Sequence, residues 1–128
     1  ECLIGDKQYF KQWQKTNPYF GKKFSVLGDS ISTLEGCHPQ GYKVFFKDEI
    51  CKRTGVVKET DTWWGKVIRF FGGELLVNNS WSGSRVTMVP ENSELFPSAC
   101  SDERTGFLHW DEEVPDVILV YLGTNDLK

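Results

Sequence analysis

Three short apolar runs stand out along the chain, and none of them alternates between apolar and polar positions. They cover Phe24 to Leu27, Glu74 to Asn78 and Val117 to Leu122, and the last one reads VILVYL. Runs of this length without alternation are typical of strands that are buried on both faces, as in parallel sheets. The pattern therefore predicts three buried strands.

Two segments show helical spacing of their apolar residues instead. The first spans Asp6 to Gln14 and ends before Asn17-Pro18, and the second begins after the N-cap candidates Asp61-Thr62 and ends at Gly72-Gly73. Each segment is therefore predicted to be an amphipathic helix. Their apolar stripes consist of Tyr9, Phe10 and Trp13 in the first helix, and of Trp63, Trp64, Val67, Ile68 and Phe71 in the second.

The remaining text is irregular and is predicted to be loop. Residues 36–60 follow the first strand and are interrupted by glycine and proline, and residues 90–101 read in the same way. The order strand, loop and helix, strand, mixed region, strand favours a parallel sheet in an α/β fold.

Length and charge exclude several classes of function. A chain of 128 residues fits one globular domain, and its formal charge of -3 comes without any basic run. Nucleic acid is therefore not an expected partner. No apolar run approaches the ~20 residues of a membrane-spanning helix, so no membrane partner is expected either.

The cysteines and histidines do not form a metal-binding pattern. Four cysteines are widely spaced, no CxxC pair occurs, and only two histidines could join them. Free thiols are expected, with a Cys37–Cys51 bridge left open. The stretch GCHPQGYK has Tyr42 where a phosphate-binding loop needs lysine, so no metal or other cofactor is predicted.

The residues that follow the three predicted strands carry the candidate chemistry. They are Gly28-Asp29-Ser30, then residues 79–83 (NSWSG), then residues 123–126 (GTND). Because ligands of open α/β sheets bind beyond the carboxyl ends of the strands, these groups should converge on one edge. A serine, a glycine in a tight loop and an asparagine amide suit acyl transfer, which needs a nucleophile and donors for an oxyanion.

VLGDSIST, VNNSWSGS and LGTND resemble the first three conserved blocks of the SGNH hydrolases, also called GDSL esterases and lipases. The resemblance spans Phe24 to Asp126. It implies a flavodoxin-like, three-layer α/β/α fold and a carboxylesterase, lipase or carbohydrate deacetylase. By the same resemblance Ser30 is the nucleophile, and its own N–H, the N–H of Gly83 and the side-chain amide of Asn125 form the oxyanion hole.

Three further residues receive roles by their place in these blocks. Asp29 and Asp126 lie beside the nucleophile and the amide, and we expect them to shape the loops without reacting. Trp81 lies in the Gly83 loop and is a candidate for lining a pocket for a small-molecule or carbohydrate ester, although packing is as good an explanation.

The sequence departs from the family at the general base. The family ends with an Asp that precedes a His by a few residues, and neither His38 nor His109 matches that position. Residues 1–128 are therefore expected to be a single domain, with a helical lead-in over 1–23, that is incomplete at its C-terminus. Weak or no activity is expected of this chain alone, because the base is missing.

The third predicted strand would then have a free edge. VILVYL is apolar on both faces, and nothing after Lys128 supplies a partner strand. We expect this edge to be bare or to pair with another molecule through self-association.

Two other functions stay open at this point. A non-catalytic module could use the same loops to hold a carbohydrate or acyl ligand. A flavodoxin-like phosphate-binding protein could use residues 28–32 as the start of a helix whose N–H groups hold an anion.

Overall fold

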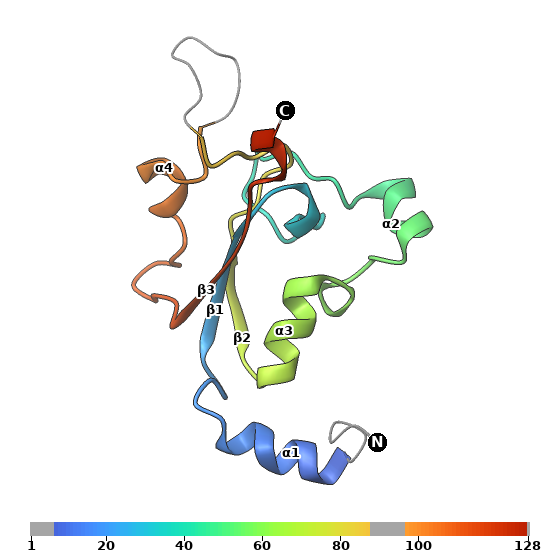
Figure 1. The fold of residues 1–128 in the computed structure, drawn as a ribbon, viewed down its shortest axis with the longest axis vertical. Helices are drawn as coiled ribbons and strands as arrows, with labels where there is room; N and C mark the ends of the chain where they lie inside the picture. Colours follow the sequence, from blue (N-terminus) through green and yellow to red (C-terminus); the bar gives the residue numbers. More distant parts are fainter. Residues whose placement is uncertain (1–6, 88–96, 128) are drawn as a thin grey trace.

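A parallel sheet of three strands forms the centre of the protein, in the order β2-β1-β3 (Figure 1). The structure is a computed structural model that describes residues 7–87 and 97–127. The three strands confirm the predicted ones, and β3 ends one residue earlier than expected. The strands are β1 (Lys23–Gly28), β2 (Glu74–Asn78) and β3 (Val117–Tyr121); the helices are α1 (Lys7–Thr16), α2 (Asp48–Thr54), α3 (Trp63–Phe71) and α4 (Asp102–Thr105); the 3₁₀ helices are η2 (Ser30–Ser32), η3 (Glu59–Asp61) and η4 (Thr124–Leu127).

Helix α3 connects β1 to β2 and covers one face of the sheet (Figure 1). Phe24 and Val26 of β1 are buried against Trp64 and Ile68 of α3 in the larger core cluster. Both ends of α3 follow the prediction: the Thr62 side chain accepts a hydrogen bond from a backbone N–H of the first turn, and a glycine with positive φ ends the helix.

The other face of the sheet carries a smaller core cluster. Leu27 of β1 is buried there with Ala99 and Leu108, and Leu122 packs against them. On the same face the hydroxyl of Ser25 donates a hydrogen bond to the carbonyl of Leu108 at 2.6 Å. The segment that surrounds α4 is thereby held on this face, which gives the chain the predicted α/β architecture.

The N-terminal helix α1 lies at the far end of the sheet from the predicted site (Figure 1). The rings of Phe10 and Trp13 lie 5.3 and 5.2 Å from the ring of Phe70 at the end of α3. The side chain of Gln14 donates hydrogen bonds to the carbonyls of Arg69 and Phe70 in the last turn of α3. Helix α1 therefore serves as packing and as a C-terminal cap for α3.

The prediction of a continuous loop over residues 36–60 is wrong. This segment contains the short helix α2. Its first turn is acidic, its last turn is basic, and it ends at the C-cap Gly55 with φ +78°, which are features that favour a helix. Its apolar residues are too few to form a stripe, so the spacing of apolar residues along the sequence does not predict this helix. Of the loop predicted over 90–101, residues 90–96 lie outside the described residues.

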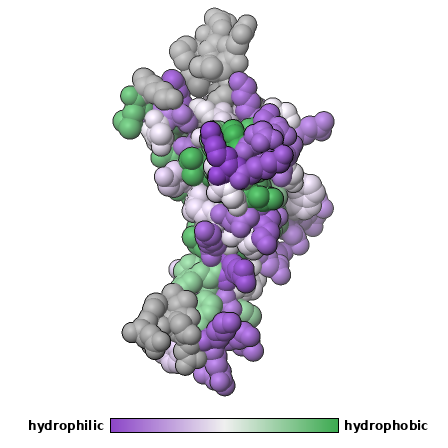
Figure 2. Space-filling model, turned by 90° about the vertical axis from the view of Figure 1, so that its right-hand side faces the viewer, coloured by the Kyte–Doolittle hydropathy of each residue, from purple (hydrophilic) through white to green (hydrophobic). Residues whose placement is uncertain are grey.

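The surface formed by α2 and α3 is mostly hydrophilic, with small hydrophobic areas between the polar ones (Figure 2). Among the described residues, no helix has both the length and the apolar composition needed to cross a membrane.

The described cysteines, Cys37, Cys51 and Cys100, are all free, so the open possibility of a Cys37–Cys51 bridge is not realised.

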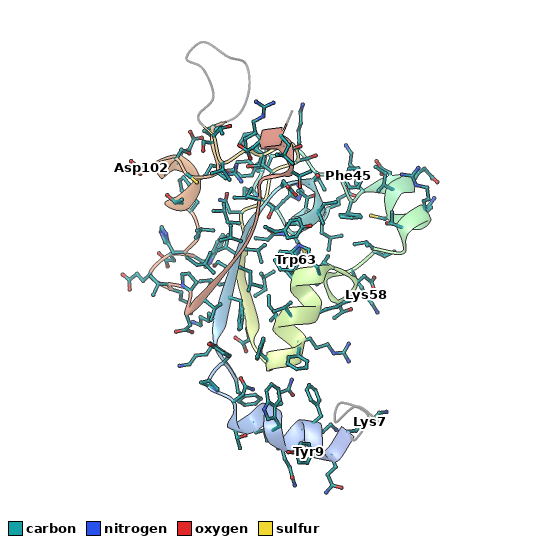
Figure 3. The ribbon with its side chains drawn as sticks, viewed as in Figure 1. Lys7, Tyr9, Phe45, Lys58, Trp63 and Asp102 are labelled. Atoms are coloured by element: carbon teal, nitrogen blue, oxygen red, sulfur yellow. The ribbon has the colours of Figure 1, made fainter. Side chains whose placement is uncertain are left out.

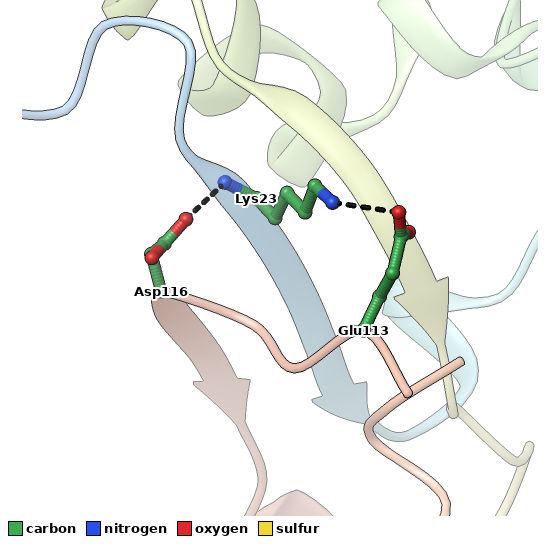
Figure 4. Close-up of polar contacts among 3 residues, drawn as sticks. All are labelled: Lys23, Glu113 and Asp116. Carbon is green, nitrogen blue, oxygen red and sulfur yellow. Dashed lines mark hydrogen bonds and ion pairs between the residues drawn. The ribbon is translucent and has the colours of Figure 1, made fainter. Parts of the chain in front are cut away.

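A polar latch holds the start of β3 against the start of β1 (Figure 4). The backbone N–H of Lys23 donates to a carboxylate oxygen of Asp116 at 2.9 Å, and the Lys23 ammonium lies 2.9 Å from a carboxylate oxygen of Glu113. The hydrogen bond to Glu113 raises the pKa of Lys23. With this anchor Phe24 pairs with Val117, and the two strands run in register to their ends.

The outer side of β3 pairs with no strand in the described part of the chain, since its ladder joins β1 alone. Ile118 and Val120 are 47% and 58% exposed on one face, and Tyr121 is exposed as well. Exposed strand edges with apolar side chains are templates for pairing with another chain. We propose that this edge mediates self-association with a second copy of the chain.

Val120→Lys should weaken that self-association roughly tenfold or more, because it places a charge in an apolar contact. Sedimentation velocity over a range of concentrations measures the effect. Val57→Lys, at an exposed valine on the loop after α2, is the matched control. A chain that stays monomeric at every concentration, or associates equally well with Lys at position 120, would contradict the proposal.

Thr62→Ala should destabilise the fold by about 1–2 kcal/mol, because the buried Thr62 hydroxyl caps α3. It accepts from the N–H of Gly65 at 2.9 Å and donates to the carbonyl of Glu59 at 2.6 Å. Chemical unfolding measures the change. Thr62→Ser should retain most of the stability, and the exposed Thr60→Ala should change it little.

Candidate active site

The three loops that follow the strands lie together at one end of the sheet (Figure 1). The 3₁₀ helix η2 follows β1, residues 79–87 follow β2, and η4 follows β3. Because β1 and β3 end in register, with Gly28 opposite Tyr121, the first and third loops start side by side.

Ser30 begins η2, and its neighbour Asp29 forms the N-cap of that turn. One carboxylate oxygen of Asp29 accepts the N–H of Ile31 at 3.1 Å. Asp29 is almost fully buried, and burial raises the pKa of its carboxyl. The carbonyl of Ser30 accepts bonds from the backbone N–H and the hydroxyl of Thr33, at 3.2 and 2.7 Å, which close the turn.

Ser32, two residues after Ser30, is the anchor of this turn. Its carbonyl accepts the indole N–H of Trp64 at 2.9 Å and the side-chain amide of Asn78 at 2.8 Å. Its hydroxyl accepts the indole N–H of Trp63 at 3.0 Å, from the first turn of α3 (Figure 3). Helix α3 and strand β2 together therefore fix the turn that carries Ser30.

Close approach explains why β1 ends in glycine. A Cβ atom at Gly28 would lie 2.3 Å from the hydroxyl oxygen of Ser32 and 3.2 Å from that of Ser80. No side chain can occupy this position without moving the anchored turn.

The second loop carries Gly83 and is held at several points by backbone hydrogen bonds. The N–H of Trp81 donates to the carbonyl of Gly28 at 3.1 Å, and the N–H of Ser82 donates to the carbonyl of Lys43 at 2.9 Å. Gly83 itself has φ +91°, a conformation that favours glycine. The loop is thereby attached to the end of β1 and to the segment after η2.

The third loop is attached to the second by side chains of η4. The amide nitrogen of Asn125 donates to the carbonyl of Ser84 at 3.0 Å. The carboxylate of Asp126 accepts the N–H of Val86 at 3.0 Å and that of Thr87 at 2.7 Å. The N–H groups of Thr87 and Val86, in that order, lower the pKa of Asp126.

Trp81 packs against neighbouring side chains in the structure. Its ring stacks on that of Tyr42, with 3.9 Å between centroids and 21° between planes, and the guanidinium of Arg104 lies 5.6 Å from its centroid. The ring is half-buried, so part of it remains accessible from solvent.

No described side chain forms a hydrogen bond with the hydroxyl of Ser30, as a general base would. His38 instead lies 3.3 Å from the carbonyl of Leu34 through Nδ1. His38 and His109 both line a groove of about 590 Å³ along β2, and Ser30 does not line it.

Cys37 lines the same groove, but it is a poor rival nucleophile. Its thiol lies 3.3 Å from a carboxylate oxygen of Glu59. Burial is the main cause that raises the pKa of the thiol to about 11, and the contact with Glu59 adds to it. At neutral pH it is therefore a thiol and not the reactive thiolate.

Metal chemistry has no visible support either. Within residues 7–87 and 97–127, no group of three or more His, Cys, Asp or Glu side chains is arranged to hold a metal ion.

Sequence reasoning placed the loops at one edge but missed the residues that hold them. Trp63 and Trp64 belong to the apolar stripe predicted for α3, but their indole N–H groups also donate hydrogen bonds to Ser32. Ser84 and Arg104 carried no signal, because serine in a loop and arginine in a polar run are ordinary surface patterns. The signals for the short helix that contains Arg104 are its N-cap Ser101 and the acidic residues of its first turn.

A parallel α/β sheet with a serine, a glycine and an asparagine on adjacent strand-end loops defines a hydrolase-like class of site. The family of GDSL-like lipases and acylhydrolases matches residues 22–128, and the chain belongs to this family. Among curated proteins it has no significant match.

Two crystal structures resemble the chain at 32% sequence identity and a TM-score of 0.64 each. One is a protein from Bacteroides ovatus, provisionally named a GDSL-like lipase; the match covers 83% of this chain and 50% of that one. The other, from Bacteroides uniformis and named in the same way, is matched over 98% of this chain and 52% of its own length. The chain thus spans about half the length of these proteins.

The contact of Asp126 with the second loop should be lost in acid. Because the pKa of Asp126 is lowered from its unfolded value of about 3.9, its stabilising contribution is complete above that pH. It is lost as the pH falls through the folded pKa.

The amide resonances of Val86 and Thr87 should therefore shift together below about pH 4, which ¹H–¹⁵N NMR measures. Asp126→Asn should remove this titration. If the two amides still titrate in that variant, another group controls them.

Proposed function

We propose that this chain carries the nucleophile and oxyanion hole of an ester hydrolase, with Ser30 as the nucleophile. The observation that supports this most is the junction at Ser84, whose carbonyl accepts the Asn125 amide at 3.0 Å directly beside Gly83. This contact supports the proposal because it holds the Asn125 amide against the residue that follows Gly83. The proposed third donor is the N–H of Ser30, in the turn that Ser32 anchors.

The proposed roles follow from the chemistry of acyl transfer. The hydroxyl of Ser30 attacks the ester carbonyl, and the oxygen that becomes negative is held by the N–H groups of Ser30 and Gly83 and by the Asn125 amide. An amide nitrogen carries two N–H groups, so one can bind Ser84 while the other faces the substrate. When the tetrahedral intermediate collapses, the ester C–O bond breaks and the alcohol leaves with the proton given up by the Ser30 hydroxyl; water then hydrolyses the acyl-enzyme, which releases the acid and restores the Ser30 hydroxyl.

The general base is the part that the described residues do not supply to Ser30. A general base contributes typically ~10²–10⁴-fold to such reactions. By analogy with serine proteases that lack a triad member, a residual ~10³–10⁴-fold over water would remain. We therefore propose that this chain alone has weak or no esterase activity.

The substrate class is proposed as a small-molecule or carbohydrate ester. Trp81 borders the Gly83 loop and is half-buried, so an edge of its ring can contact an acyl group or a sugar. The stacking on Tyr42 would then hold that ring in place for the substrate.

A fluorophosphonate probe should label Ser30 slowly but selectively, because it reacts with a serine that has an oxyanion hole. Intact-mass measurement and peptide mapping locate the adduct. Ser30→Ala should abolish labelling, and Ser82→Ala, a serine in the neighbouring loop, should not. Turnover of p-nitrophenyl acetate by the unmodified chain should stay near background.

Two results would contradict the proposal in different ways. Absence of any Ser30 adduct, together with binding of a carbohydrate or acyl ligand, would favour the non-catalytic module. Rapid ester turnover that disappears in Ser30→Ala would show that a base does reach Ser30, from His38, His109 or a second copy.

A further inference from the structure

Arg104 of α4 is a fully buried charge, with 0% of its surface exposed. Among the described residues, no carboxylate lies within ion-pair distance of its guanidinium, since the ion pairs found there involve only lysines. Burying a charge is costly unless it is paired or well hydrogen-bonded. The contacts of Arg104 therefore indicate what the buried charge is for.

All the hydrogen bonds found for its guanidinium go to the two ends of one loop. Nε donates to the side-chain oxygen of Asn79 at 2.9 Å, and Nη2 donates to the carbonyl of Asn79 at 3.0 Å. Nη1 donates to the hydroxyl of Ser84 at 2.7 Å. The planar, forked guanidinium thus spans residues 79 and 84, and Gly83 lies between them.

The contact with Ser84 extends to the third strand-end loop. While the hydroxyl of Ser84 accepts from Arg104, its carbonyl accepts from the side-chain amide of Asn125. A continuous chain of hydrogen bonds therefore runs from α4 through Ser84 to η4. Both Gly83 and Asn125 are placed by groups that Arg104 holds.

Aromatic rings complete the surroundings of the guanidinium. Its central carbon lies 5.3 Å from the ring centroid of Tyr42 and 5.6 Å from that of Trp81. These distances are within the range of cation–π attraction, which replaces part of the lost hydration. The rings also keep solvent and substrate from Arg104, so the residue cannot bind a substrate anion directly.

We propose that Arg104 is the positioning residue of the oxyanion hole, setting the Gly83 loop and the Asn125 amide relative to Ser30. The inference rests on the proposed function of Ser30. It assigns to α4 a role in the reaction rate rather than in substrate binding.

Arg104→Met tests this role, because Met removes the charge and the three hydrogen bonds while filling much of the same space. The substitution leaves the buried acceptors of Asn79 and Ser84 without these donors, so a loss of stability is expected and folding is checked by circular dichroism. The maximal rate constant for fluorophosphonate labelling of Ser30 should fall about 10–100-fold, since small displacements of catalytic groups cost this much. The probe concentration that gives half-maximal labelling should change by no more than about twofold.

Two further variants make the result specific. Arg53→Met, at an exposed arginine in the last turn of α2, is the matched control and should label like the unmodified chain. When Arg104→Met is added to Asn125→Ala, the further loss of labelling rate should be much smaller than in the unmodified chain, because both residues act on the same oxyanion. Arg104→Lys, which keeps the charge but not the fork, should recover only part of the rate.

The outcomes separate this inference from the proposed function. If the unmodified chain is not labelled at Ser30, the proposed function fails and the inference fails with it. If it is labelled, and the folded Met and Lys variants are labelled at the same rate, only the role of Arg104 is wrong. Should the Met variant not fold, the Lys variant decides: a full rate with an unchanged Gly83 amide resonance overturns the inference.

Discussion

The hydrogen bonds that Ser32 accepts from α3 and β2 are the interactions on which the site depends. A strand that ends at a tight turn leaves backbone groups unpaired, and here the Ser32 carbonyl is buried and takes donors from Trp64 and Asn78. Removing one donor from a buried acceptor costs about 1–3 kcal/mol. The turn that carries Ser30 is therefore held by the same residues that form the core, and cannot move independently of it.

The fold could be predicted largely because its signals are local. The unalternating apolar runs marked the strands, and Thr62 and Gly72 marked the ends of α3 by the chemistry of capping. Helix α2 was missed because its only signals are charge asymmetry and Gly55, which a search for apolar period passes over. Its stability comes from contacts of Ile50 and Cys51 with the core, which no local pattern reveals.

The position of the candidate site could be predicted from the sequence, but the residues that support its loops could not. Parallel strands bring their carboxyl ends together whatever the loops contain, so topology alone predicted that the loops with Ser30, Gly83 and Asn125 share one end of the sheet. The hydrogen bonds that fix them join residues 20 to 46 positions apart in the chain. Such pairings depend on the packed fold, and the sequence around Arg104 looks like any polar surface helix.

The supports of the two halves of the site differ in their physical character. The turn that carries Ser30 is held by neutral donors within the core, whereas the loops that carry Gly83 and Asn125 are held by a buried guanidinium and by the carboxylate of Asp126. Charged hydrogen bonds are stronger and more directional than neutral ones, and a donor that must face a developing negative charge needs that rigidity. The loops after β2 and β3 are joined to each other at Ser84, and they meet the end of β1 through the N–H of Trp81. The segment that follows α4 is itself held on the sheet, because Leu108 packs with Leu27 and its carbonyl accepts the hydroxyl of Ser25.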